Sequence, residues 1–342
     1  MAYILNQRQS DNQRTEMKNI PFMPTIFEHA AFLIGETPST AARSSKLIKE
    51  AFIKAYQTYN PDVLTIGIDV YNIEAEALGC EVRYFNDNSI PGIITRPVSL
   101  ESDPEDIKFT LNSGRIKSIL DAAVAVKNEI HYDIPVSIGI CGPFSILMET
   151  TGYDIAINAI IHEDERIKNL LEALLRFQIN YCKVIIDLGL SVTVFESWAT
   201  PPLVSPQIYK EYVFPYEKRL FTFLKENGAV RRPLVIGGNT NSIVDEIIQT
   251  GTTLLVSDFN TPLQLYVEKA RSKELYIRAN IDPKMIQYGL WDNIKQRINE
   301  IDKYAVDYSK IIYGTGVIPY DTPPENIIKL KKMLENDINI TL

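Results

Sequence analysis

The chain has 342 residues, of which 23% are charged and 45% hydrophobic, and its formal net charge is −8. This length accommodates one large α/β barrel or two smaller domains. The negative charge argues against nucleic acid or an anionic membrane surface as the main partner, and no apolar run reaches the roughly 18 residues of a membrane-spanning helix. The three cysteines, Cys80, Cys141 and Cys182, are too few and too scattered for a disulfide framework, so we expect a reducing, cytoplasmic environment.

Strands and helices are expected to alternate along most of the chain. Residues 1–20 are polar and mixed in charge, so we expect an N-terminal helical extension or arm there rather than a signal peptide. Residues 21–342 are expected to form a single domain. The expected strands are Pro24–Phe27, Val63–Asp69, Val136–Ile140, Ser191–Phe195, Pro233–Ile236, Thr253–Ser257, Leu275–Ala279 and Lys310–Tyr313. The expected helices are Ala41–Tyr56, Ser113–Glu129, two within Ser145–Gly189, Tyr212–Asn227 and Pro324–Asn336.

Eight strands, most of them followed by a helix, predict an α/β fold of the (β/α)8 TIM barrel type. The segment from Glu81 to Phe109 contains Pro91-Gly92 and Pro97 and is expected to form a hairpin and loop excursion after the second strand. Ser205 and Thr322 precede prolines and are expected to cap helices. No Gly-x-Gly-x-x-Gly motif follows the first strand, so a dinucleotide-binding fold has no support.

Polar residues follow most of the expected strands, at the end of a barrel where function resides. They are Glu28, His29, Asp69, Glu74, Cys141, Glu196, Asp258, Asn280 and Asp282. Burying an unpaired charge is costly. A buried strand that leads directly into Asp69 therefore predicts that this carboxylate faces a pocket rather than the core. The alternative is an ordinary strand end followed by a solvated helix cap. We expect Asp69, Glu196 and Asp258 to be catalytic.

Aromatic and polar residues near the same strand ends are candidates for substrate binding. Tyr71, Phe144 and Trp198 are expected to line a pocket for a flat ring, although such residues also serve as core packing. Arg278 is expected to pair with the acid cluster or with a substrate carboxylate, and Asn280 follows it on the same strand.

Several motifs are distributed from about residue 20 to residue 336. They are Glu74-Ala-Glu-Ala-Leu-Gly79, Gly142-Pro-Phe, Leu203-Val-Ser-Pro206, Gly238-Asn-Thr240 and Thr322-Pro-Pro-Glu-Asn326. Together they resemble the uroporphyrinogen decarboxylase superfamily, which includes the decarboxylase itself and corrinoid-dependent methyltransferases.

The chain resembles some branches of that superfamily more than others. The decarboxylases carry an arginine-rich segment after the first strand, where this chain reads Glu28-His29-Ala-Ala-Phe32. The thiol-methylating branch binds zinc through His-x-Cys and a further Cys, and the matching positions here are Val235, Gly237 and Thr315. The segment Asp69-Val-Tyr-Asn-Ile-Glu-Ala-Glu76 is most similar to the methyltransferases that begin the demethylation of methoxylated aromatics.

This third branch implies an enzyme that transfers a methyl group from an aromatic methyl ether to the Co(I) corrinoid of a partner protein. Zinc would polarise the ether oxygen, and zinc sites use three protein ligands and one open position. His29, Glu74 and Cys141 are the expected ligands, with Asp69 or Glu196 as substitutes for Glu74. Members of the family are often dimers, so a homodimer is possible.

Two other functions remain open for such a barrel. The first is a decarboxylase-like lyase that acts on a smaller carboxylic acid, with Asp69 stabilising a protonated intermediate. The second is a corrinoid- or ligand-binding barrel without catalytic activity.

Overall fold

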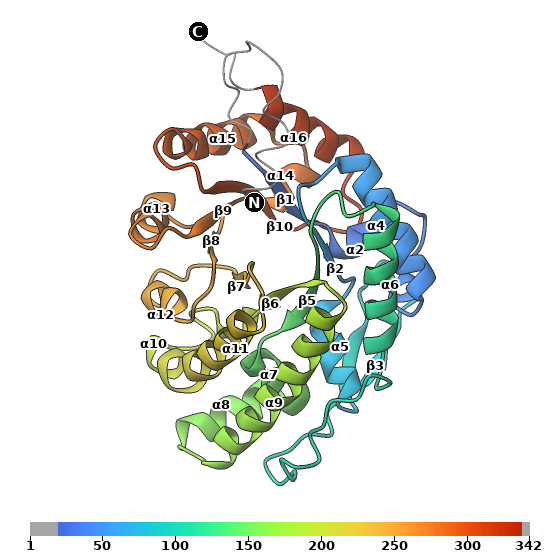
Figure 1. Ribbon diagram of the computed structural model, residues 1–342, viewed down its shortest axis with the longest axis vertical. Helices are drawn as coiled ribbons and strands as arrows, with labels where there is room; N and C mark the ends of the chain where they lie inside the picture. The colour runs from blue at the N-terminus through green and yellow to red at the C-terminus, as the bar shows by residue number, and fades with distance from the viewer. Residues whose placement is uncertain (1–19, 337–342) are drawn as a thin grey trace.

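The computed structural model describes residues 20–336, so the expected N-terminal arm lies outside the described residues except for Ile20. Parallel strands form the centre of the molecule and helices surround them (Figure 1). These strands are β1 (Phe22–Thr25), β2 (Leu64–Ile66), β5 (Val136–Cys141), β6 (Ser191–Phe195), β7 (Leu234–Val235), β8 (Leu254–Ser257), β9 (Tyr276–Ile281) and β10 (Ile311–Val317).

The strands pair in two parallel groups of four, in the orders β1-β10-β9-β8 and β2-β5-β6-β7. Backbone hydrogen bonds connect the groups on both sides. The Asp62 N–H donates to the Phe22 carbonyl at 2.9 Å beside β1, and the Thr253 N–H donates to the Arg232 carbonyl at 3.0 Å beside β7. The strands therefore follow one another around a ring in chain order, which is the order of a (β/α)8 barrel.

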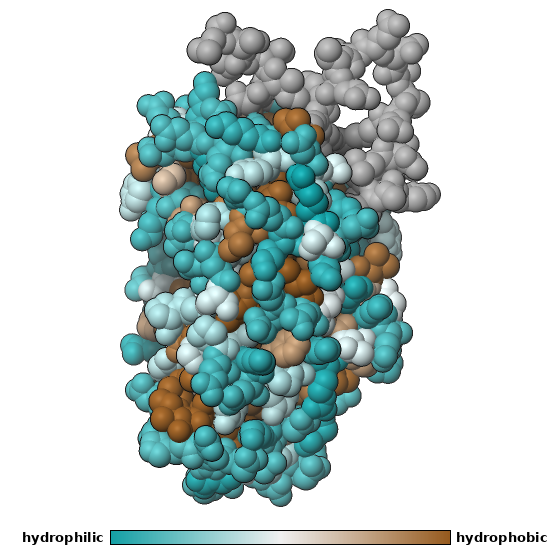
Figure 2. Space-filling model, turned by 90° about the vertical axis from the view of Figure 1, so that its left-hand side faces the viewer, coloured by the Kyte–Doolittle hydropathy of each residue, from teal (hydrophilic) through white to brown (hydrophobic). Residues whose placement is uncertain are grey.

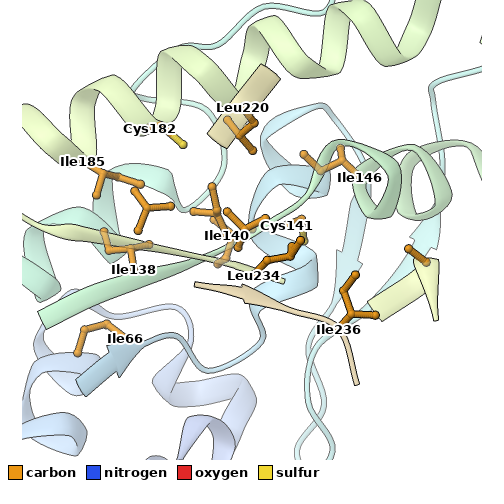
Figure 3. Close-up of a cluster of buried hydrophobic side chains, with 14 of the residues drawn as sticks. Ile66, Ile138, Ile140, Cys141, Ile146, Cys182, Ile185, Leu220, Leu234 and Ile236 are labelled. Carbon is orange, nitrogen blue, oxygen red and sulfur yellow. The ribbon is translucent and has the colours of Figure 1, made fainter. Parts of the chain in front are cut away.

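Apolar side chains form two layers, one on each side of this ring. A small cluster inside the barrel contains Met23, Leu254, Val256 and Ile312. A much larger core lies between the strands and the surrounding helices, and Figure 3 shows part of it, where Cys141 and Cys182 lie among isoleucine and leucine side chains. Strands that are covered on both faces are accordingly nearly continuous apolar runs.

Capping residues at their first turns stabilise several helices, in addition to the apolar faces that pack on the core. The Ser44 hydroxyl accepts from the Leu47 N–H at the start of α4 (Ser45–Tyr59), and Ser205 caps α10 (Pro206–Ile208) in the same way, as expected. The other main helices are α2 (Phe27–Phe32), α5 (Val70–Ala77), α6 (Ile116–Glu129), α7 (Pro143–Thr151), α8 (Tyr153–Ile161), α9 (Arg166–Asp187), α11 (Phe214–Glu226), α12 (Val244–Gln249), α13 (Leu263–Arg271), α14 (Pro283–Gln287), α15 (Trp291–Ala305) and α16 (Pro324–Asn336).

Three local expectations differ from the structure. Glu28 and His29 lie in the first turns of α2 rather than at the end of a strand. The segment from Ser145 to Gly189 contains most of α7 and all of α8 and α9, three helices rather than two, because Gly152 separates α7 from α8. The Thr322 hydroxyl, which was expected to cap the last helix, has no hydrogen-bond partner among the described residues.

The expected excursion after the second strand is an antiparallel pair, β3 (Glu81–Arg83) with β4 (Gly92–Thr95). Its loop is tied to the barrel by the Asn72 side-chain amide, which donates to the Pro91 carbonyl at 2.6 Å. Among the described residues, no helix is long and apolar enough to cross a membrane. The side of the molecule that carries α12 and α13 is mostly hydrophilic, with separate apolar patches (Figure 2).

Candidate active site

A cavity of about 600 Å³ lies at the carboxyl ends of the barrel strands. Residues that follow β1, β2, β6, β7, β8 and β9 line it, together with residues of β10 and of the β3–β4 loop. Because active sites of this fold lie at that end of the barrel, the cavity is the candidate active site.

Aromatic and aliphatic side chains form most of the cavity wall. Phe27 and Phe195 contact each other with their ring centroids 5.3 Å apart. Val256 on β8 and Phe259 in the loop after it also line the cavity. Tyr71, expected to bind substrate, lines the cavity, and its hydroxyl donates to the Ser197 hydroxyl. A wall of this kind suits a flat, largely apolar ligand.

Glu28 is the carboxyl group best placed to exchange a proton with a ligand. It is half-buried, it lines the cavity, and it follows Phe27, whose φ of +27° is rare for a residue with a side chain. Burial, followed by the negative charge of Asp69, raises the pKa of Glu28 to about 7. A carboxyl group with that pKa is protonated about half of the time at neutral pH and serves as a general acid or base.

Asp69 lines the same cavity but is already paired. The guanidinium of Arg115 donates from Nη1 to Oδ1 at 2.9 Å and from Nη2 to Oδ2 at 2.7 Å. Arg115 Nε also contacts Glu76, at 2.5 Å. Burial raises the pKa of Asp69, and the charge of Arg115 opposes that shift. Asp69 is therefore a fixed part of the cavity wall, held from behind by Arg115.

Asp258 and Asn280 lie together at the ends of β8 and β9. Asp258 accepts hydrogen bonds from the N–H groups of Gly238 at 2.7 Å and Phe259 at 2.9 Å. The Asn280 side-chain amide also donates to it, at 3.2 Å. Both residues line the cavity, and Asp258 is held in place by three donors; the catalytic role of Asp258 and the substrate-binding role of Asn280 stay predictions.

Arg278 lies deeper in the cavity than Asn280, two residues earlier on β9. Its Nη2 donates to the Thr25 hydroxyl and to the Thr315 carbonyl, the latter at 2.6 Å. Burial lowers the pKa of Arg278 to about 10, which still leaves the guanidinium charged at neutral pH.

Three other expected site residues lie outside this cavity. Phe144 is buried in the core around the barrel. Glu196 is fully buried behind the wall, where its carboxylate accepts from the Ser145 N–H at the start of α7. Trp198 lines a neighbouring cleft of about 490 Å³ and donates from Nε1 to Glu149 at 2.7 Å.

The three expected zinc ligands are not brought together. Both ring nitrogens of His29 are engaged: Nε2 lies 2.6 Å from the Tyr59 hydroxyl, and Nδ1 lies 2.9 Å from the Tyr320 carbonyl. Glu74 and Cys141 do meet, because the Cys141 N–H donates to the Glu74 carboxylate at 2.8 Å, but neither residue lines the cavity, and Cys141 belongs to the large core. No group of three His, Cys, Asp or Glu side chains within residues 20–336 could hold a metal ion, so these residues do not fit a zinc site.

We expect His29→Ala to lower the free energy of unfolding by about 2–4 kcal/mol, because it removes a buried ring and leaves the Tyr59 hydroxyl unsatisfied. Urea denaturation measures this change, and elemental analysis of the same samples measures bound metal. The exposed His162→Ala is the control and should change stability by less than about 0.5 kcal/mol. A His29→Ala protein of unchanged stability that had lost bound zinc would contradict the structural role.

The buried carboxyl groups Glu196 and Glu217 make stability depend on pH. Burial raises the pKa of Glu196 to about 7, and burial together with Glu196 raises the pKa of Glu217 well above its usual value. The folded state therefore favours their neutral forms, and their contribution to stability falls as pH rises from about 4.5 through 7. We expect Glu217→Gln to increase the free energy of unfolding by about 1–3 kcal/mol at pH 8, and by much less at pH 5. Urea denaturation at both values tests this, and an equal change at both would contradict it.

Two residues of the site have no strong signal in the sequence. Glu28 was only one of nine polar residues near strand ends, and its raised pKa depends on a cavity that the sequence does not show. Arg115 is 46 residues from Asp69, so no local spacing connects the two side chains.

Comparisons with known proteins agree with this fold. The family model of uroporphyrinogen decarboxylase (URO-D) matches residues 12–336, and the chain belongs to this family. The expected superfamily is thereby confirmed.

The relatives of the chain include more than one activity. A methylcobamide:CoM methyltransferase MtbA of Methanosarcina acetivorans is 25% identical over 267 residues, which are 77% of this chain and 76% of that protein. A uroporphyrinogen decarboxylase of Trichormus variabilis is 23% identical over 81% of this chain and 79% of its own length. The solved structure of a methyltransferase from Methanosarcina mazei superposes with a TM-score of 0.78 at 16% identity, covering 94% of this chain and 95% of that one. This likeness confirms the expected fold class.

Proposed function

We propose that this protein is a corrinoid-dependent methyltransferase that takes the methyl group from a methoxylated aromatic compound and transfers it to the Co(I) corrinoid of a partner protein. The observation that carries the proposal is Glu28, a carboxyl group with a pKa of about 7 in a cavity walled by aromatic side chains. The similarity to a methylcobamide:CoM methyltransferase supports methyl transfer as the reaction class.

The cavity favours a methyl donor or acceptor other than a thiol. In the thiol-methylating branch, the positions that match Val235, Gly237 and Thr315 bind zinc. All three residues line the cavity of this chain, and none of their side chains is a usual zinc ligand. A substrate thiol would therefore lack its activating metal at this place, whereas an aryl ether needs a proton donor instead.

The proposed reaction breaks the bond between the methyl carbon and the ether oxygen. Co(I) supplies the electron pair that forms the new bond to the methyl group, and the electron pair of the broken bond stays on the phenolic oxygen. Glu28 donates its proton to that oxygen, so the products are a phenol and the methylated corrinoid. Proton donation of this kind accelerates reactions by about 10²- to 10⁴-fold. No step passes through zinc, because the residues expected to bind it do not converge.

The partner would approach over the cavity mouth. Large apolar side chains that line the cavity are exposed on the β3–β4 hairpin, after β8 and at the end of β10: Ile90, Phe259 and Val317. Exposed apolar groups around a functional opening are typical of contact surfaces for another protein, which supports docking of a corrinoid protein at this end of the barrel.

Anaerobic incubation with Co(I) cobalamin and a panel of methoxylated aromatics tests the proposal. We expect the absorbance of methylated cobalamin to appear together with an equal amount of phenol, and the rate to rise when a corrinoid protein replaces free cobalamin. Release of CO₂ from an aromatic or aliphatic acid without corrinoid, and no methyl transfer, would instead favour the lyase. Ligand binding without either reaction would favour a non-catalytic barrel.

A further inference from the structure

Arg278 is a buried cation without a counter-ion in direct contact. Only 3% of its surface is exposed, and none of the ion pairs among residues 20–336 includes it. Both of its hydrogen bonds are donated by Nη2, to Thr25 and Thr315, and its Nε has no partner within the described chain. A buried charge that is not paired is costly, so a site that retains one normally pairs it with a ligand.

The absence of a side chain at Gly314 leaves room for Arg278. Gly314 lies on β10 opposite Asn280 and beside Arg278. A Cβ atom at position 314 would lie 2.5 Å from Arg278 Cγ, from Arg278 Nε and from Asn280 Oδ1. The guanidinium therefore occupies space that any other residue at position 314 would fill.

None of the four acids that line the cavity contacts Arg278 directly, and one of them, Glu149, accepts from Trp198 Nε1. Asp69 is bound in bidentate fashion by Arg115. Asp258 is close enough to act on Arg278 electrostatically, but its oxygens already accept from Gly238, Phe259 and Asn280. Glu28 is half protonated at neutral pH. The charge of Asp258 thus acts on Arg278 without a direct ion pair, and no carboxylate of the described residues is in hydrogen-bond contact with the guanidinium.

We infer that the methyl donor carries an anionic group, in the simplest case a carboxylate on the aromatic ring, and that Arg278 binds this group at the floor of the cavity. That the ligand is a methyl donor rests on the proposed function. That it is anionic rests on the contacts of Arg278. Arginine is suited to this role because its planar guanidinium matches a carboxylate.

The position of Arg278 also orients the ligand. A strand rises about 3.3 Å per residue, so Arg278 lies roughly 6–7 Å below Asn280 along β9. A carboxylate held at this depth directs the opposite end of the ring toward the mouth, where Glu28 lies and where a corrinoid would approach. The methoxy group is therefore expected on the side of the ring away from the carboxylate.

Calorimetric binding without any corrinoid tests the inference. We compare 4-methoxybenzoate with the neutral, nearly isosteric 4-methoxybenzamide. The wild-type protein should bind the acid about 10- to 100-fold more tightly, which is the usual effect of a charge-assisted hydrogen bond. Arg278→Gln should bind acid and amide equally. Arg176→Gln removes one positive charge from an ion pair on the surface of α9 and should retain the full preference.

Equal binding of acid and amide by the wild-type protein would overturn the inference, and so would an Arg278→Gln protein that still preferred the acid. If Arg278→Gln does not fold by circular dichroism, Arg278→Lys replaces it, with an expected partial loss of preference, because lysine keeps the charge but not the planar donor pair. Methyl transfer is assayed separately. Preferential binding of the acid without methyl transfer in any assay would leave the anion site standing and would remove the proposed function.

Discussion

Glu28→Gln is expected to reduce the rate of methyl transfer by about 10²- to 10⁴-fold. Glutamine has nearly the shape of glutamate but cannot donate a proton to the departing phenolic oxygen. The decrease should appear in kcat more than in KM, because the ring is held by Phe27, Phe195 and the rest of the aromatic wall. Stopped-flow formation of methylated cobalamin measures the rate.

Two further measurements, the pH dependence of the rate and its dependence on the acidity of the departing phenol, show whether Glu28 acts as a proton donor or only shapes the cavity. Since Glu28 has a pKa of about 7 and must be protonated to act, the wild-type rate should fall as pH rises above about 7. This limb should be absent in Glu28→Gln. Donors with strongly acidic phenols need no proton and should lose much less than 10²-fold. The exposed Glu50→Gln on α4 is the matched control; a pH limb that persisted in Glu28→Gln would assign the acid to another group.

Arg115→Met is expected to lower the free energy of unfolding by about 3–5 kcal/mol, as breaking a buried ion pair usually does. Only 7% of Arg115 is exposed, and it holds Asp69, Glu76 and the Ala42 carbonyl together. Methionine fills similar space but leaves the Asp69 carboxylate buried and unpaired. Urea denaturation at pH 7 measures the loss.

The double variant Arg115→Met/Asp69→Asn tests whether the unpaired carboxylate is the cause. Removing the charge of Asp69 should restore part of the stability, so the two changes should be clearly non-additive. Arg176→Gln, which breaks the exposed pair with Glu105, should cost less than about 1 kcal/mol. A loss below 1 kcal/mol in Arg115→Met would show that the pair contributes little to stability.

The barrel could be predicted because its signals are repeated and local. Each buried strand is a short apolar run, and each helix has an apolar face, so eight alternations were visible even where a boundary was displaced by two residues, as at β1. The end of β1 was less predictable. The turn into α2 depends on the positive φ of Phe27, which neither composition nor periodicity indicates, and this turn gives Glu28 and His29 different surroundings.

The site was predicted only in part, because a residue at a strand end can face either the cavity inside the barrel or the helices outside it. Asp69, Tyr71, Asp258, Arg278 and Asn280 line the cavity, whereas Glu74, Cys141 and Glu196 lie on the helix side of the strands. Which side a residue takes after the last hydrogen-bonded pair depends on the following turn. Contacts such as His29 with Tyr59, or Asp69 with Arg115, join distant segments and leave no local pattern to detect.

The close approach of Arg278 to Gly314 has a consequence for which residues related sequences can carry at these two positions. Because a side chain there would collide with the guanidinium of Arg278, Gly314 is not free to change while the arginine is kept. Across the family, arginine at the position of Arg278 should therefore occur only together with glycine at the position of Gly314 on the neighbouring strand. Sequences that carry both would then mark the members that accept anionic substrates, and sequences that carry neither would mark members whose barrel floor is neutral.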